Sequence, residues 1–144
     1  RDLEPVAPNM AAAGERINDA RRHIRSARTL ADDDITLAIA ACHDSIRKAI
    51  TAHMNANGYR PRGGDGAHRI VLAYERTQLA TLIAASDIDD ADDLRRDRGI
   101  AEYDQFAHSR LQAVDVLAAA DLAERVVNAV AKALATRSRS RPKA

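Results

Sequence analysis

Residues 41–72, ACHDSIRKAITAHMNANGYRPRGGDGAHRIVL, contain most of one amphipathic helix, a turn and the start of a second helix. Apolar residues recur there at three- and four-residue spacing, which marks the buried face of a helix. Gly58 fits the left-handed position that ends many helices, and Pro61 prevents the helix from continuing. The glycine-rich stretch 63–66 is a turn by composition. The segment therefore predicts two helices joined by a turn, with no strand.

The same periodicity extends over most of the chain. The expected helices span about residues 10–30, 35–57, 67–84, 91–103 and 109–136. The acidic stretch 87–93 is interpreted as a linker and a first helical turn, and Gly99 interrupts the short helix that follows. The clearest apolar stripes are Ile17, Ala20, Ile24 and Ala27 in the first helix, and Val114, Ala118, Leu122, Val126, Val130 and Leu134 in the last.

The size and composition of the chain favour a single helical domain. Its 144 residues are 46% hydrophobic but only 3% aromatic, which suits close packing of helices and suits a sandwich or barrel poorly. We expect an all-α, antiparallel bundle of four to five helices over residues 10–136. Residues 1–9 are expected to be a flexible arm, and residues 137–144, RSRSRPKA, a basic disordered tail.

Charge and cysteine content exclude several classes of protein. The net charge of +1 gives no overall attraction to nucleic acid, although arginines cluster locally. Cys42 is the only cysteine, so the chain has no internal disulfide and no cysteine metal site. No apolar run approaches the roughly 20 residues that span a bilayer, and the acidic start is unlike a signal peptide. We therefore expect a cytoplasmic protein with no membrane contact and no cofactor.

The order of features in residues 41–72 resembles that of HEPN domains. These features are a Lys-Ala pair, the glycine at the helix end, the proline and then His68 at the start of the next helix. The resemblance covers about residues 10–136 and implies a helical bundle associated with nucleotides, RNA and toxin–antitoxin pairs. The second signature of that family is an arginine followed four to six residues later by a histidine. Here Arg98 is present, but Tyr103 stands where the histidine would be.

That departure determines the expected chemistry of the first candidate site. The resemblance makes Arg98 and Tyr103 the candidate catalytic residues. Tyr103 is a poor general base because the usual pKa of tyrosine is about 10, yet it can donate a hydrogen bond and stack on a base. Arg95, Arg98 and Glu102 share one helix face, so Arg98 and Glu102 can also simply pair. The expected ligand-binding residues of this helix are Arg95, Arg98, Glu102 and Tyr103.

A second arginine–histidine pair lies in the glycine-rich turn. Arg62 precedes His68 by six positions, but the intervening glycines leave the geometry of the pair undefined, and a capping or packing role for His68 is favoured. Arg62 and His68 are kept as ligand-binding candidates. No metal site is expected: His43 and His53 are separated along a helix by about 15 Å.

These observations lead to one preferred function and two alternatives. The preferred function is a non-catalytic or weakened HEPN-type module that binds nucleotide, RNA or a cognate protein partner in a toxin–antitoxin or phage-defence setting. The first alternative is an active, metal-independent HEPN ribonuclease that uses Arg98. The second alternative is a helical oligomerisation module without a ligand. In each case the long apolar helix faces and the resemblance favour a homodimer.

Overall fold

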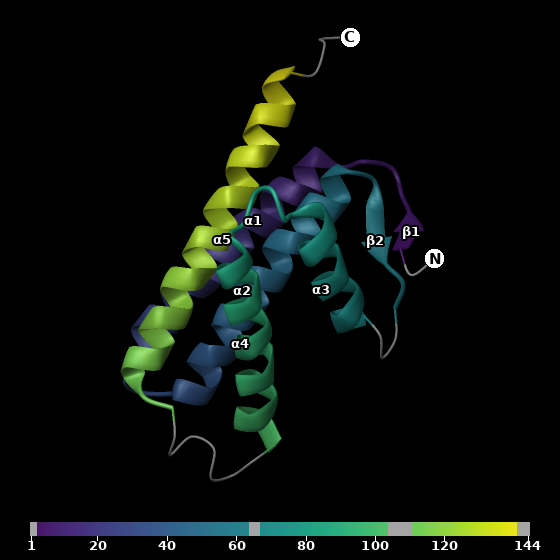
Figure 1. Cartoon of the computed structure of the whole chain (residues 1–144). Helices are drawn as coiled ribbons and strands as arrows, with labels where there is room; N and C mark the ends of the chain where they lie inside the picture. Colours follow the sequence, from purple (N-terminus) through teal and green to yellow (C-terminus); the bar gives the residue numbers. More distant parts are fainter. Residues whose placement is uncertain (1–2, 64–66, 104–110, 141–144) are drawn as a thin grey trace.

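The described part of the chain forms five helices and a small two-stranded ribbon (Figure 1). The computed structural model describes residues 3–63, 67–103 and 111–140; the side chains of residues 67–68, 97–103, 138 and 140 are outside the described part. The elements in chain order are β1 (Leu3–Pro5), α1 (Met10–Leu30), α2 (Ile35–Ala56), β2 (Tyr59–Pro61), α3 (Ala67–Gln78), α4 (Ala85–Tyr103) and α5 (Ala113–Ser140). The expected all-α bundle is confirmed.

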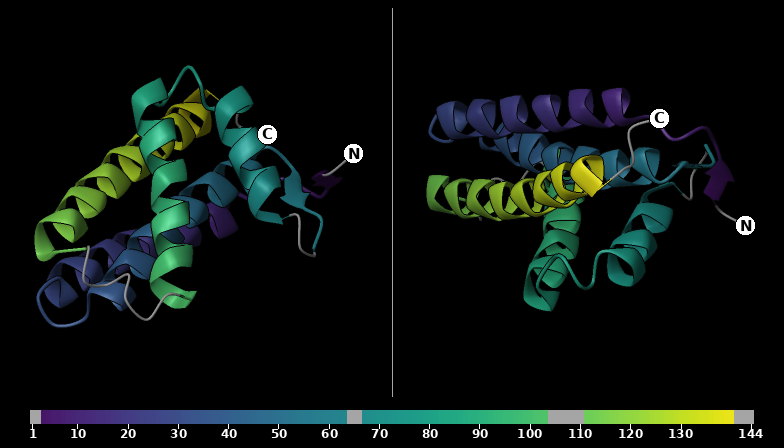
Figure 2. Two further views of the ribbon diagram at one scale, coloured as in Figure 1. Left: turned by 60° about the horizontal axis from the view of Figure 1, so that its bottom comes forward. Right: turned by 90° about the horizontal axis from the view of Figure 1, so that it is seen from above.

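Helix α2 lies at the centre and contacts all four other helices. Helix α1 runs antiparallel to α2 and to α5, whereas α2 and α5 run in the same direction, since Cys42 lies near Val116 and Asn57 near Arg137. Helices α3 and α4 connect the end of α2 to the start of α5. They cover one side of these two helices (Figure 2). None of the helices in the described ranges combines the length and the apolar character needed to cross a membrane.

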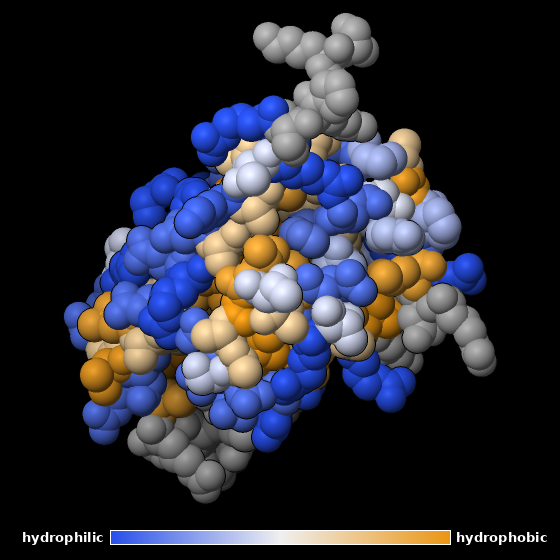
Figure 3. Space-filling view, turned by 45° about the horizontal axis from the view of Figure 1, so that its top comes forward, coloured by the Kyte–Doolittle hydropathy of each residue, from blue (hydrophilic) through white to orange (hydrophobic). Residues whose placement is uncertain are grey.

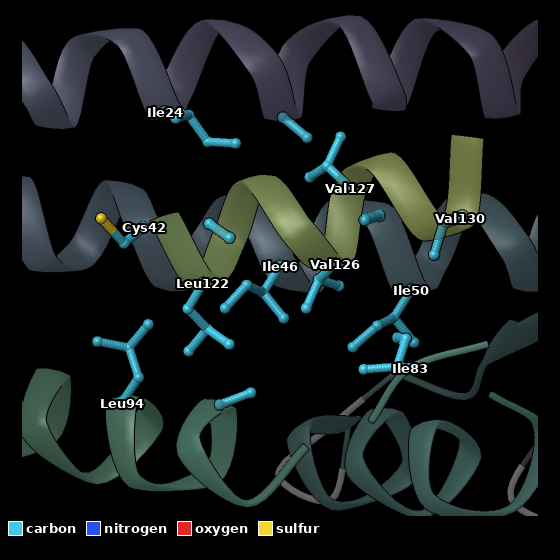
Figure 4. Packing of buried hydrophobic residues seen from close by; sticks show 14 of the residues in the cluster. Ile24, Cys42, Ile46, Ile50, Ile83, Leu94, Leu122, Val126, Val127 and Val130 are labelled. Carbon is cyan, nitrogen blue, oxygen red and sulfur yellow. The ribbon is translucent and has the colours of Figure 1, made fainter. Parts of the chain in front are cut away.

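The core is built from small and β-branched aliphatic side chains. Ala13, Ala20 and Ala27 of α1 are fully buried at seven-residue spacing, and this spacing lets α1 approach α2 closely. Figure 4 shows Ile46 of α2 and Val126 of α5 in the middle of this core. The predicted stripe of α1 is confirmed in full, because Ile17 and Ile24 are buried as well.

Side-chain caps and one glycine define the ends of α1 and α2. Asn9 and Asp34 each accept a hydrogen bond from the backbone amide three residues later, as N-cap residues do. Gly58 has a φ of 82°, which confirms the predicted left-handed position after α2. The amide of Val6 donates to the carbonyl of Gly58 at 2.9 Å, so the N-terminal arm is fixed against this turn.

The N-terminal arm corrects the prediction that residues 1–9 are loose and that the chain has no strand. Strand β1 pairs antiparallel with β2, with Leu3 opposite Pro61 and Pro5 opposite Tyr59. The ion pair between Glu4 and Arg60, at 2.8 Å, lies on this ribbon. Two prolines and no periodicity gave no local signal for a strand, because the pairing partner is more than 50 residues away in the chain.

The bounds of the last three helices also differ from the prediction. Helix α3 ends at Gln78 rather than near residue 84, and α4 begins at Ala85 rather than near residue 91. The acidic stretch is helical because Ile88 and Leu94 bury one face of it. Helix α5 begins at Ala113 and continues through Ser140, so its last turn includes residues that were expected to be a disordered tail.

Candidate functional site

A pocket lies between α2, α3 and the β-ribbon. Its volume is about 650 Å³, which is within the range of small-molecule sites. The residues that line it are Leu3, Pro5, His53, Asn57, Tyr59, Ile70, Ala73, Tyr74, Thr77 and Gln78. We call this cavity the ribbon pocket. It combines apolar and aromatic walls with several neutral polar side chains, as ligand sites commonly do.

Local sequence features position the polar groups of the ribbon pocket. His53 lies in the last turns of α2, and Asn57 follows as its C-cap residue four positions later, so both point to the same side. Tyr59 starts β2 directly after the turn at Gly58, and its side chain is exposed. Tyr74 comes from the middle of α3 and is buried.

A hydrogen-bonded group of side chains occupies the inner end of the ribbon pocket. The Tyr74 hydroxyl lies 2.8 Å from Nδ1 of His53, and the two ring centroids are 5.7 Å apart. The amide nitrogen of Asn57 lies 3.2 Å from the same Nδ1 atom. Arg137 of α5 donates to the Asn57 amide oxygen, which fixes the orientation of that amide.

Burial and the charge of Arg137 set the protonation of this group. Nδ1 of His53 lies within hydrogen-bond distance of the Tyr74 hydroxyl and of the Asn57 amide nitrogen, and the amide nitrogen also donates to the His53 carbonyl at 2.8 Å. Burial lowers the pKa of His53, and the positive charge of Arg137 lowers it further. Burial also raises the pKa of Tyr74 to about 12. At neutral pH the group is therefore a neutral imidazole, a neutral phenol and one guanidinium.

A second polar cluster lies between α2, α3 and α4. Glu75 of α3 is 2% exposed, and its Oε1 atom has no hydrogen-bond partner among the described residues. It borders a cavity of about 30 Å³, enough for a water molecule. Burial raises the pKa of Glu75 to about 7. The other charged or titratable residues that line this cavity are His43, Arg47, Asp92 and Arg95.

The predicted site residues are spread over the molecule where they are described. Arg95 lines the small cavity beside Glu75 and pairs with Asp92 at 3.2 Å. Arg62 is exposed just after β2 and lines neither this cavity nor the ribbon pocket. Arg98, Glu102 and Tyr103 belong to α4, and His68 to the first turn of α3, but these four side chains lie outside the described residues.

Sequence analysis did not identify the ribbon pocket. As a functional residue His53 was considered only as a metal ligand, Tyr74 was not a candidate site residue, and Arg137 was assigned to a disordered tail. One local signal was present: a histidine and an asparagine four residues apart at the end of a helix share a face. The contributions of Tyr74 and Arg137 depend on tertiary packing and have no counterpart in local sequence.

Within the described ranges, no group of three or more His, Cys, Asp or Glu side chains is arranged to hold a metal ion. Cys42 is buried in the core, and burial raises the pKa of its thiol to about 12. A thiol with such a pKa is inert at neutral pH. The polar groups of the ribbon pocket and of the Glu75 cavity are therefore the main chemical features.

Comparison of the chain with protein-family models, with curated proteins and with solved structures gives no match. The resemblance to HEPN domains therefore stays a prediction, and function must be argued from the pocket itself.

Proposed function

We propose that the chain is a binding module for a nucleotide, or for the nucleotide unit of an RNA chain, and that the ribbon pocket receives it. The observation that carries this proposal is that Tyr59, His53 and Asn57 line one cavity of about 650 Å³, and that Arg137 donates a hydrogen bond to the Asn57 side chain. A nucleotide needs an aromatic or apolar surface for its base, donors and acceptors for the base edge, and a cation for its phosphate.

Each of these needs has a counterpart in the pocket. The exposed ring of Tyr59, together with the nearby Leu3 and Pro5, offers a surface against which a base can stack. The Gln78 side chain can donate and accept hydrogen bonds, and the Thr77 hydroxyl, which donates to the Ala73 carbonyl at 2.8 Å, can accept one. A planar heteroaromatic group stacked on this surface of the ribbon pocket therefore has its edge near the polar atoms of Thr77 and Gln78.

Arg137 supports an anionic ligand rather than a neutral one. Its charge acts on both His53 and Tyr74, because it lowers the pKa of each. No aspartate or glutamate lines the ribbon pocket in the described part of the chain. A phosphate bound beside Asn57 lies near the Arg137 guanidinium, and charge-assisted contacts of this kind favour binding.

A titration with the four nucleoside monophosphates tests the proposal. We expect saturable binding by calorimetry, and we expect Arg137→Gln to weaken it about tenfold or more, as loss of one charge-assisted contact does. Arg25→Gln is the matched control, because Arg25 is exposed on α1 and lines no cavity described above. Absence of binding to the wild-type protein, or equal losses in the two variants, contradicts the proposal.

Metal-independent RNA cleavage is a second candidate, because the lowered pKa of His53 leaves it a neutral imidazole, the group that most often serves as a general base. A neutral imidazole beside a phenol and a guanidinium can accept the proton of an RNA 2′-hydroxyl. We expect this activity to be absent or weak, because Nδ1 of His53 already lies within hydrogen-bond distance of Tyr74 and Asn57. The assay is cleavage of mixed RNA in EDTA by the wild type, His53→Ala and Arg98→Ala. Loss of cleavage in Arg98→Ala assigns the activity to the α4 motif, and loss in His53→Ala assigns it to the pocket.

We also propose that the protein is a homodimer. Three apolar side chains at the end of the bundle where α2 and α5 begin are strongly exposed: Leu37 by 53%, Val114 by 65% and Leu117 by 44%. Figure 3 shows hydrophobic side chains on the surface at this end, at the lower left. Exposed apolar residues grouped in this way are typical of surfaces that bind another chain.

A further inference from the structure

A second cavity lies on the other side of the β-ribbon from the ribbon pocket. Its volume is about 450 Å³, and it is lined by Val6, Ala7, Asn9, Ala12, Arg16, Thr51, Asn55, Arg60 and Pro61. Two of these residues are arginines and none is acidic, within the described part of the chain. We call it the arginine cavity.

The β-ribbon is the wall that the two cavities share. Successive side chains of a strand point to opposite faces. Leu3, Pro5 and Tyr59 line the ribbon pocket, whereas Arg60 and Pro61, at the end of β2, line the arginine cavity. Both cavities therefore border the β-ribbon.

Arg16 is the main cation of this cavity. It is half-buried on α1, and its Nε atom donates to the Asn55 side-chain oxygen at 2.7 Å. A guanidinium has five N–H donors, and this bond uses one of them. No carboxylate within the described residues pairs with Arg16, whereas Arg60 is held by Glu4 through two hydrogen bonds. The positive charge of Arg16 is thus fixed in place and is not neutralised by an ion pair.

Asn55 links the two cavities. Its oxygen accepts from Arg16, and its nitrogen donates to the backbone carbonyl of Tyr59 at 3.3 Å. The guanidinium that faces one cavity and the aromatic residue that lines the other are therefore held by one side chain. Asn55 has a short side chain on α2, so the position of the Arg16 guanidinium relative to the Tyr59 backbone is defined.

We propose that the arginine cavity binds the phosphate adjacent to the nucleotide in the ribbon pocket, so that the ligand is a single-stranded oligonucleotide of two or more nucleotides. This inference rests on the proposed function and narrows it from a mononucleotide to a nucleic-acid strand. An aromatic surface beside a fixed cation is the arrangement by which proteins bind single strands. The β-ribbon supplies the aromatic surface, and Arg16 supplies the cation.

Paired titrations test the inference. The ligands are the mononucleotide that binds most tightly, the corresponding 5′-phosphorylated dinucleotide in RNA and DNA form, and inorganic phosphate. We expect the dinucleotide to bind about tenfold more tightly than the mononucleotide, with a salt dependence steeper by about 0.7 per additional phosphate contact. Arg16→Gln should remove both differences and leave mononucleotide affinity within about twofold. Arg16→Lys should keep part of the gain, and Arg25→Gln on the same helix should keep all of it.

The outcomes separate the two proposals. A dinucleotide that binds no more tightly than the mononucleotide, or a gain that survives Arg16→Gln, overturns the inference and leaves the proposed function intact.

If no mononucleotide binds, the proposed function fails, and inorganic phosphate then tests the arginine cavity alone. Phosphate should shift the backbone amide resonances of Ala12 and Asn55 in the wild type and not in Arg16→Gln. Unchanged resonances overturn the inference independently. A thermal melt of each variant identifies any effect of unfolding.

Discussion

Glu75 is the most deeply buried acidic residue in the described part of the chain. Its carboxyl group is enclosed by α2, α3 and α4, and one oxygen has no partner among the described residues. Desolvation by burial is the largest influence on its pKa; Asp92 acts in the same direction, and Arg76 acts against both. His43, Arg47 and Arg95 border the same cavity. Burying an ionised carboxylate is costly, so the folded protein favours the protonated acid.

The contribution of Glu75 to the stability of the protein should therefore fall as the pH rises from 4.5 to about 7. The folded-state pKa of Glu75 is about 7, above the usual 4.5, so the folded state holds a proton that the unfolded state releases in this interval. The effect of this residue amounts to about 3 kcal/mol and levels off above the folded-state pKa. Glu75→Gln should remove this dependence, as measured by urea unfolding at a series of pH values. An equal pH slope in wild type and Glu75→Gln contradicts the assignment.

Gly58 is the residue at which backbone conformation matters most. Its φ of 82° lies in the left-handed region, and a Cβ atom there would meet the Val6 carbonyl oxygen at 2.9 Å. Gly58→Ala should therefore reduce the free energy of unfolding by about 1–3 kcal/mol. Gly14→Ala is the matched control, because Gly14 lies within α1 with open space around it. That substitution should stabilise the protein by about 0.5–1 kcal/mol. Equal effects of the two changes in chemical denaturation would contradict this account.

At the scale of elements, the sequence predicted helix existence better than helix bounds. The bounds of α1 agree with the prediction, because its cap and its apolar repeat are both local. The start of α4 was placed six residues late, since the aspartates near Asp87 were interpreted as a linker. Yet Ile88, Ala91 and Leu94 recur at three-residue spacing, which is a helical signal in the sequence itself.

The predicted face of α5 shows the limit of periodicity alone. Leu122, Val126, Val130 and Leu134 are buried as predicted. Val114 and Ala118 are exposed, and Val116 is buried instead, against Cys42 of α2. In a helix rich in alanine and valine, several stripes fit the apolar pattern equally well, so the choice among them depends on the neighbouring helices. The ribbon pocket was missed for the same reason, because its residues come from four separate elements.

The N-cap of α2 gives a prediction at this scale. Asp34, the last of three consecutive aspartates, accepts from the amide of Leu37 at 3.1 Å. Asp34→Ala should lower the free energy of unfolding by about 1 kcal/mol, because that amide loses its partner. Asp33→Ala is the control: it removes the same charge one residue earlier without removing the cap. A loss for Asp33→Ala as large as that for Asp34→Ala in chemical denaturation would mean that charge, and not capping, stabilises this helix end.

At the scale of the whole molecule, the two ends of the bundle differ in chemistry. The end where α2 finishes carries the ribbon pocket, the arginine cavity and Arg137. The opposite end, where α2 and α5 begin, exposes Leu37, Val114 and Leu117. In the proposed dimer, in which two copies associate through their apolar ends, this separation leaves the end with the two cavities accessible; Figure 1 shows the two ends of one chain. Nucleotide binding and dimer formation should then be independent.

The prediction is that Val114→Glu converts a dimer into a monomer and leaves nucleotide affinity unchanged. A charge at a position 65% exposed in the single chain costs little there, but it is unfavourable inside an apolar interface. Leu82→Glu is the control, because Leu82 is also exposed, by 39%, and belongs to the turn between α3 and α4.

Sedimentation velocity at micromolar concentration measures the assembly, and circular dichroism confirms that helix content is retained. A stable dimer buries at least about 1,000 Å², so a wild-type protein that sediments as a monomer contradicts the proposed dimer. A dimer that persists in Val114→Glu and dissociates in Leu82→Glu means that the interface lies on the α3–α4 side.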